Sequence, residues 1–309
     1  MNSTRIAVVG AGLMGVGIAT RFAQHGYPTV LYDIDAGRVA NASTIVGVIL
    51  DELLAAGQID AATRQQALDN LRTSATLSEI ADAGVVIEAV PENLALKHAI
   101  YRDLEALLAA DAIIGSNTSG FPPDALAPHM VHPERFLIMH FWNAPHTIPL
   151  VEIVPGTATA KDLPQRVADL LSAVGAQPVI LEKAIPGFIG NRLQFAVLRE
   201  ALAIVQSGAA SAEVVDTVMK ASLGRRYGLM GPFEVADLGG LDTILAIAEH
   251  LMPELASDQS CLALLREQVA AGRTGLRAGA GFYEWTEARQ VHAQDVRAQQ
   301  LLLKTIDHP

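Results

Sequence analysis

The sequence predicts an α/β protein with two domains: a Rossmann-type doubly wound sheet over residues 1–185, followed by an all-α domain over residues 186–309. Short apolar runs alternate with helix-like stretches as far as residue 181. Polar residues do not interrupt these runs, which is typical of parallel strands buried on both faces. After residue 186 only helical patterns recur. The chain of 309 residues, 50% of them hydrophobic, is long enough for two cores.

The expected elements of the first domain follow from these patterns. Helices are expected from the glycine-rich turn to about Gln24, over residues 36–73 and over residues 164–174. In the second of these, helical spacing predicts one apolar stripe, made of Ile45, Val48, Ile49, Leu53 and Leu54. The expected strands are 6–9, 29–32, 85–90, 112–115, 136–141, 150–154 and 177–181.

The second domain begins with a long apolar pattern from Phe188 to Gln206, which predicts one helix. Its apolar arc is too wide for a lone surface helix, so we expect a homodimer. Residues 286–309 are predicted to add a further helix. Its apolar residues are Val291, Val296, Leu301, Leu302 and Leu303.

Composition argues against several kinds of partner. The net charge is −11 and the pI about 5.2, so the surface repels phosphate backbones and we expect no nucleic-acid partner. The sequence shows no cationic amphipathic segment of the kind that binds a membrane surface, so we expect no membrane partner. The single cysteine, Cys261, cannot form an intramolecular disulfide, which fits a reducing cytoplasm. His129 and His132 lie in a proline-rich loop without a carboxylate ligand, so we expect no metal site.

A glycine-rich turn follows the first strand and opens a helix. Gly10, Gly12 and Gly15, with Leu13 and Met14 between them, fit the pattern G-x-G-x-x-G. Glycines allow the backbone to approach a pyrophosphate, and a helix N-terminus presents free N–H groups to it. The strand–turn–helix context makes this short motif specific, and it predicts a dinucleotide site.

Asp33 closes the second strand, where a carboxylate accepts hydrogen bonds from the adenosine ribose and repels a 2′-phosphate. Without the glycine motif, Asp33 would be a solvated residue at a strand end. Arg38 lies nearby in the sequence and offers a cation to a phosphate. We expect NAD rather than NADP as the cofactor.

Six short polar or glycine-containing segments stand out along the chain: 90–93 (VPEN), 116–119 (SNTS), 140–143 (HFWN), 150–152 (LVE), 186–192 (PGFIGNR) and 279–283 (GAGFY). In this order they resemble the L-3-hydroxyacyl-CoA dehydrogenase superfamily. The resemblance runs from about Arg5 to about Trp285, and the ordered set is far more specific than any single segment.

The resemblance implies roles for the polar residues of these segments. His140 matches the family's catalytic histidine, a side chain suited to take a hydroxyl proton near neutral pH. Glu152 matches the carboxylate that orients this histidine and stabilises the imidazolium. Ser119 and Asn191 match groups that hold the substrate oxygen. Taken singly, each has a structural interpretation, as a core histidine, an edge-strand charge, a turn residue or a helix cap.

The resemblance also implies cofactor contacts beyond the glycine turn. Asn143 and Lys97 match positions that contact the nicotinamide half, and Glu92 matches a position near the cofactor and the active-site cleft. The family's helical domain forms the dimer interface. A group of dehydrogenases with similar N-termini uses an interdomain lysine, but residues 187–192 offer Asn191 and no lysine.

The substrate class is left open between a small free acid and a CoA ester. In acyl-CoA members the helical arm after the second strand carries lysines, whereas residues 33–60 hold one basic residue and five acidic ones. Residues 140–152 look more like the branch with L-gulonate and carnitine dehydrogenases, λ-crystallin and a pyridine-carboxylate dehydrogenase. Arg226 is the best candidate to bind a substrate carboxylate, although with Arg225 it also fits a solvated loop pair.

The sequence therefore predicts an NAD-dependent dehydrogenase acting on the 3-hydroxyl of a small hydroxy acid, or reducing the 3-keto form. A 3-hydroxybutyryl-CoA dehydrogenase is the alternative within this class. Because λ-crystallin shares the scaffold, a non-catalytic NAD-binding structural protein is the alternative of another class. The presence of His140, Glu152 and Asn191 favours an enzyme.

Overall fold

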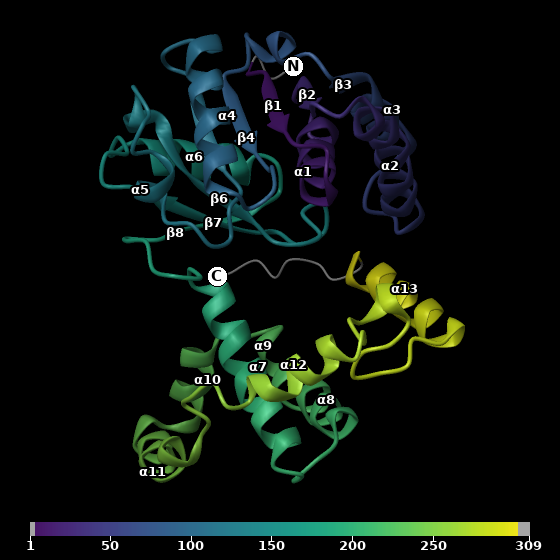
Figure 1. Ribbon diagram of the computed structural model, residues 1–309, viewed down its shortest axis with the longest axis vertical. Helices are drawn as coiled ribbons and strands as arrows, with labels where there is room; N and C mark the ends of the chain where they lie inside the picture. Colours follow the sequence, from purple (N-terminus) through teal and green to yellow (C-terminus); the bar gives the residue numbers. More distant parts are fainter. Residues whose placement is uncertain (1–3, 302–309) are drawn as a thin grey trace. The chain divides into compact units, whose positions relative to one another are not determined.

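A computed structural model describes residues 4–301 of the chain (Figure 1). Apart from the end of the last helix, the described chain divides into two compact units between Ile189 and Gly190. The first is built on a sheet and the second is helical, so the predicted fold class is confirmed. No helix among residues 4–301 is long and apolar enough to cross a membrane.

The first unit is an eight-stranded sheet of order β3-β2-β1-β4-β5-β6-β7-β8. All neighbouring strands are parallel except β6 and β7, which are antiparallel. The order reverses between β1 and β4, and in such sheets a ligand binds beyond the carboxyl ends of the strands at this switch point. The strands are β1 (Ile6–Val9), β2 (Thr29–Tyr32), β3 (Leu71–Ser74), β4 (Val85–Glu88), β5 (Ile113–Ser116), β6 (Phe136–Phe141), β7 (Leu150–Pro155) and β8 (Gln177–Ile180).

Helices cover both faces of this sheet, and each face has its own buried core. One core packs α1 (Leu13–Gln24), α2 (Ala36–Ala55), α3 (Ala61–Asn70) and α6 (Leu163–Ser172) against the sheet. The other packs α4 (Leu94–Leu107), α5 (Pro123–Leu126) and the short helix η1 (Leu77–Ile80). A second short helix, η2 (Pro133–Arg135), precedes β6. Because both faces are buried, the strands are apolar runs without alternation, as predicted.

Three expectations for local structure were wrong. Residues 71–73 belong to strand β3, because pairing with β2 outweighs the weak pattern of an edge strand only four residues long. The buried stripe of α2 is Ala42, Val46, Ile49, Leu50 and Leu53, so Val48 is exposed and the predicted stripe was out of phase. Phe188 was expected to start a helix, but it has a positive φ of 51° and lies before the observed helix, which begins at Gly190. Its side chain is buried in the core of the first unit.

The second unit consists of helices with short connections. Its first helix, α7, covers the rest of the predicted long helix and has Leu202 as its one buried residue. The final helix α13 confirms the predicted added helix, although Leu302 and Leu303 lie outside the described residues. The helices are α7 (Gly190–Gln206), α8 (Ala212–Ala221), α9 (Leu223–Tyr227), α10 (Pro232–Gly239), α11 (Leu241–Leu251), η3 (Met252–Glu254), α12 (Leu262–Ala270), η4 (Leu276–Ala278) and α13 (Glu287–Leu301).

Candidate active site

The glycine turn lies at the carboxyl end of β1, beside the switch point. Gly10 has a φ of 110°, and a Cβ there would lie 2.7 Å from the carbonyl oxygen of Ala89. A Cβ on Gly15 would clash with the carbonyl oxygen of Gly10. At Gly12, by contrast, no described atom lies within 4 Å of the position that a Cβ would take. The first and third glycines are therefore required by the fold, and the second leaves room for a ligand to approach the backbone.

Helix α1 begins at Leu13, directly after this turn, and Gly12 is its N-cap. None of the described side chains caps it. The amides of its first turn, which include Leu13 and Met14, have no acceptor within the helix. Leu13 is exposed. This is the arrangement that binds a pyrophosphate through N–H groups and the helix dipole.

Asp33 follows β2 and faces the same turn. Its Oδ2 accepts a hydrogen bond from Ala11 N at 2.8 Å, and its Oδ1 accepts one from Asp35 N at 2.9 Å. The nearest described cation is Arg38, whose Nη1 lies 4.0 Å from Asp33 Oδ2 and whose Nε lies 3.8 Å from Asp35 Oδ2. Arg38 is therefore balanced by two carboxylates, which leaves this end of the sheet acidic and suited to a ribose without a phosphate.

His140 and Glu152 are directly opposite each other on β6 and β7. His140 Nδ1 lies 2.9 Å from Glu152 Oε2, and the two residues are 6% and 1% exposed. Since the carboxylate can only accept, Nδ1 carries the proton and Nε2 is left as the free acceptor of the neutral ring. The antiparallel register thus places a buried carboxylate behind the imidazole.

Glu152 is itself held by further donors. Ile189 N donates to Oε1 at 2.8 Å, and Trp142 Nε1 donates to Oε2 at 3.3 Å. The ring of Phe188 packs on His140 with centroids 5.3 Å apart. These contacts position the carboxylate and the ring relative to each other without any contribution from a substrate.

Two of the predicted polar residues, Ser119 and Asn143, lie just after the carboxyl ends of strands β5 and β6. Ser119 is exposed in the segment after β5, and Asn143 is exposed in the segment after β6. Asn117 Oδ1 accepts a hydrogen bond from Phe141 N at 2.8 Å, which ties the two segments together. Asn191 is on the first turn of α7 and Arg226 is exposed on α9, both in the second unit.

Lys97 is not a surface residue, although it was expected to contact the cofactor. It is 1% exposed, and its Nζ lies 2.7 Å from Glu88 Oε1 and 3.4 Å from Glu92 Oε2. Glu92 Oε1 accepts hydrogen bonds from Thr118 Oγ1 and from Gly120 N. The structure therefore joins Glu92 and Lys97 in one ionic cluster beside Ser119.

Sequence reasoning missed Glu88 and Arg21. The signal for Glu88 was a single acidic residue inside the apolar run 85–90. Arg21 gave no local signal, because its partners are distant in the sequence. From α1 it donates to the carbonyl oxygens of Pro145 at 2.6 Å, Ile148 at 3.1 Å and Val174 at 3.1 Å. It thereby anchors the segment that follows His140 and carries Asn143.

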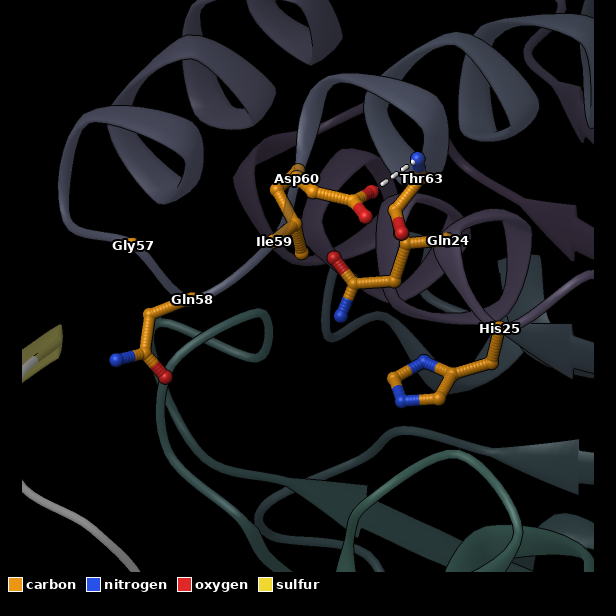
Figure 2. Close-up of a pocket in the computed structure, with 7 residues that line it drawn as sticks. All are labelled: Gln24, His25, Gly57, Gln58, Ile59, Asp60 and Thr63. Carbon is orange, nitrogen blue, oxygen red and sulfur yellow. Dashed lines mark hydrogen bonds between the residues drawn. The ribbon is translucent and has the colours of Figure 1, made fainter.

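An open pocket of about 460 Å³ lies at the far end of α1 (Figure 2). Gln24 and His25 come from the end of that helix, and Thr63 N donates to Asp60 Oδ1 at 2.7 Å on the opposite wall. Helix α1 has 12 residues, so the glycine turn is about 18 Å away. The pocket is separate from the candidate active site. It is lined by Gln24, His25, Gly57, Gln58, Ile59, Asp60 and Thr63.

A doubly wound sheet, a glycine turn after its first strand and a carboxylate after its second define a dinucleotide-binding dehydrogenase that uses NAD. The chain belongs to the 3-hydroxyacyl-CoA dehydrogenase family. The family's NAD binding domain matches residues 5–185, and its C-terminal domain matches residues 187–285. The resemblance expected from the six segments is therefore confirmed.

Relatives of two substrate types are similar to this chain. A 5-formyl-3-hydroxy-2-methylpyridine 4-carboxylate 5-dehydrogenase of Mesorhizobium japonicum is 32% identical over 298 residues, 96% of each chain. A probable 3-hydroxybutyryl-CoA dehydrogenase of Bacillus subtilis is 34% identical over 93% of this chain and 99% of its own. A crystal structure of a 5-formyl-3-hydroxy-2-methylpyridine 4-carboxylic acid 5-dehydrogenase superposes with a TM-score of 0.88, at 32% identity and 96% coverage of both chains.

Proposed function

We propose that this enzyme oxidises the 3-hydroxyl group of a small free hydroxy acid with NAD, or reduces the corresponding keto form. The observation that carries the catalytic part is the buried hydrogen bond between His140 Nδ1 and Glu152 Oε2, at 2.9 Å. It leaves Nε2 of the imidazole as the ring nitrogen that can accept a proton from the substrate.

In the oxidation, the substrate hydroxyl gives its proton to His140 Nε2 while its carbon gives up a hydride. NAD supplies the hydride acceptor when it is bound. The imidazolium that forms is stabilised by Glu152, whose position is held by Ile189 N and Trp142 Nε1. Reduction of the keto form is the reverse, with the imidazolium as the proton donor.

The other site residues take the roles that the family resemblance implies. Ser119 and Asn191 hold the substrate oxygen, and Asn143 contacts the nicotinamide half of the cofactor. Glu92 and Lys97 act there as one cluster, because the ammonium of Lys97 is buried between Glu88 and Glu92.

The acidic arm supports a free acid as the substrate. Arg64, the next basic residue on α2 and α3 after Arg38, is paired with Asp51 at 2.7 Å, and Arg38 lies near Asp33 and Asp35. A CoA ester would bring several phosphate charges to this surface. We assign the substrate carboxylate to Arg226, which offers a planar set of donors.

A 3-hydroxybutyryl-CoA dehydrogenase is the second candidate, because CoA-dependent relatives reach 34% identity over nearly their whole length. The test is to follow NADH with small hydroxy acids and 3-hydroxyacyl-CoA esters side by side. The proposal expects a higher kcat/KM for a free acid. Efficient turnover of 3-hydroxybutyryl-CoA without a competing acid would overturn the substrate class. NADH binding without turnover of either class would favour the structural role.

We also propose that the protein is a homodimer in the cytoplasm. Helices α8, α9, α10 and α11 contain no buried residue, yet they carry many large apolar side chains. An apolar surface of this kind needs a partner, and a second copy of the chain supplies one. The exposed apolar residues of these helices include Val218, Phe233, Leu238, Leu241, Leu245 and Ile247.

A further inference from the structure

Glu88 is a fully buried carboxylate at the end of β4. It is 0% exposed and accepts four hydrogen bonds. Lys97 Nζ and Val90 N donate to Oε1 at 2.7 and 2.8 Å, and Tyr101 Oη and Ser116 Oγ donate to Oε2 at 2.5 and 2.7 Å. Since a carboxylate has about four acceptor positions, all are in use. Glu88 therefore contacts no ligand itself, and its effect must pass through the groups that it holds.

The charges of this cluster do not cancel. One ammonium, Lys97 Nζ, lies between the buried Glu88 and Glu92, whose side chain is 40% exposed. Burial and the charge of Glu88 raise the pKa of Tyr101, so this phenol stays a neutral donor at any working pH. The cluster of Glu88, Lys97 and Glu92 thus carries a net charge of about −1 when both carboxylates are ionised. Its accessible edge is Glu92.

The position of the cluster decides what that charge acts on. Glu88 ends β4, which pairs with β1 at the point where the strand order reverses, and Ser116 ends the next strand. In a doubly wound sheet the second nucleotide half of a dinucleotide binds at the carboxyl ends of the strands beyond this point. The proposed pyrophosphate site at Gly12 lies in the turn that follows β1, on the other side of this point. The cluster therefore lies on the nicotinamide side of the cofactor site.

We propose that Glu88 is a positioning residue that holds Lys97 against Glu92 and so sets the net charge felt by the nicotinamide ring. The ring is positive in NAD⁺ and neutral in NADH. A net negative cluster stabilises NAD⁺ relative to NADH, which favours the release of the reduced cofactor after a substrate is oxidised. This inference rests on the proposed function only for the placement of the cofactor.

The test is the ratio of two dissociation constants, Kd(NAD⁺)/Kd(NADH), measured by isothermal titration calorimetry. In Glu88→Gln the cluster charge becomes about zero and the ratio rises. In Lys97→Met it becomes about −2 and the ratio falls. A unit charge about 10 Å away at an effective dielectric constant of about 20 changes such a ratio roughly tenfold. Losses of affinity that are common to both cofactor forms cancel in the ratio.

The double variant Glu88→Gln/Lys97→Met returns the cluster to about −1 and is expected to restore the wild-type ratio. It replaces a buried ion pair by two neutral side chains, which is tolerated far better than the loss of one partner, so it also serves if a single variant does not fold. Tyr101→Phe is the matched control, because it removes one donor to Glu88 without changing the charge, and its ratio is expected to stay at the wild-type value.

An unchanged ratio in both single variants, or a double variant that departs from the wild-type ratio, would overturn the proposal and leave Glu88 a structural residue. These measurements involve no substrate. A wrong substrate class would appear as poor turnover with a normal pattern of ratios. A wrong role for Glu88 would appear as flat ratios in an active enzyme.

Discussion

Arg21 and Pro145 connect the cofactor helix to the segment after the proposed catalytic strand: Arg21 Nε donates to the carbonyl oxygen of Pro145 at 2.6 Å. The same guanidinium also binds the carbonyl oxygens of Ile148 and Val174. Burial lowers the pKa of Arg21 to about 10, which still leaves it charged at neutral pH. One cation thus fixes a backbone segment that has no regular secondary structure.

Removing this cation is expected to destabilise the first unit. Arg21→Met leaves three carbonyl oxygens without their donor, and we expect a loss of about 2–4 kcal/mol in the free energy of unfolding. Arg21→Lys retains a charge without the planar set of donors and is expected to lose about half as much. Urea unfolding measures both. Arg64→Met is the control, because its ion pair with Asp51 is exposed and contributes about 1 kcal/mol or less. Equal losses in Arg21→Met and Arg64→Met would contradict this role.

The proposed base makes a kinetic prediction. His140→Ala is expected to reduce kcat by about 10²–10⁴-fold while NADH still binds, because proton transfer by a positioned base contributes about that much. Glu152→Gln is expected to cost less, since the amide oxygen still accepts from Nδ1 but no longer balances the imidazolium. Trp142→Phe, which removes the 3.3 Å donor to Glu152, is expected to cost least. Near-wild-type turnover by His140→Ala would contradict the proposal that His140 is the general base.

His146 predicts a dependence of stability on pH. Burial, and then the charge of Arg21, lower its pKa to about 4. Among the described residues its buried Nδ1 has no hydrogen-bond partner. An unfolded histidine takes up a proton near pH 6.5. Between about pH 6.5 and about pH 4 the unfolded state therefore binds more protons, and stability falls as the pH falls. Above that window both states are neutral and His146 contributes no slope.

The measurement is urea unfolding of the wild type and of His146→Gln across this window. The variant is expected to lose less stability on acidification than the wild type. The exposed His292 supplies the control, and His292→Gln is expected to follow the wild-type curve. Parallel curves for the wild type and His146→Gln would show that His146 takes up its proton over the same pH range in the folded and unfolded states, and would contradict the lowered pKa.

The substrate assignment predicts that changes at Arg226 impair the use of a free acid, whereas added lysines on the acidic arm improve the use of CoA esters. Arg226→Ala is expected to raise KM for the free acid by about 10–100-fold, because a charge-assisted hydrogen bond worth roughly 1.5–3 kcal/mol is lost. Arg225→Ala is the neighbouring control and is expected to have a smaller effect. Glu52→Lys and Ala56→Lys, at an exposed and a half-buried position of the acidic arm, are expected to improve the use of CoA esters alone. Asp51 is kept because Arg64 binds it.

Comparing KM for the acid and for a CoA ester in these variants is the readout. If Arg225→Ala raises KM for the acid more than Arg226→Ala does, the carboxylate belongs to Arg225. If the added lysines leave KM for the CoA ester unchanged, the phosphates of CoA do not bind at the acidic arm.

The dimer proposal concerns the exposed helices of the second unit. Light scattering is expected to give twice the mass of the chain at micromolar concentration. Phe233 is 86% exposed, so Phe233→Asp adds a charge to the apolar surface and is expected to favour the monomer. Phe195→Asp on α7, also exposed, tests whether that helix takes part. A wild-type monomer would contradict the proposal.

The sequence by itself determined the features that depend on local pattern. The run Ile6–Val9, the glycine turn and Asp33 lie within one strand–helix–strand unit, and hydrophobic periodicity and glycine chemistry act over such short distances. The ordered polar segments likewise pointed to His140 and Glu152. Their presence on neighbouring strands was foreseeable, because strands that follow one another in the chain are usually adjacent.

Only the tertiary structure decided the rest, because it depends on pairings between distant residues. The antiparallel register of β6 and β7 places His140 opposite Glu152, and a shift of one residue would turn one of them to the other face. Strand β3 exists because β2 offers it an edge. Lys97 is buried rather than exposed because Glu88 supplies its counter-charge, and Arg21 reaches carbonyl groups more than a hundred residues away. Burial of a charge is determined by its partners in space, and helical or strand periodicity carries no record of them.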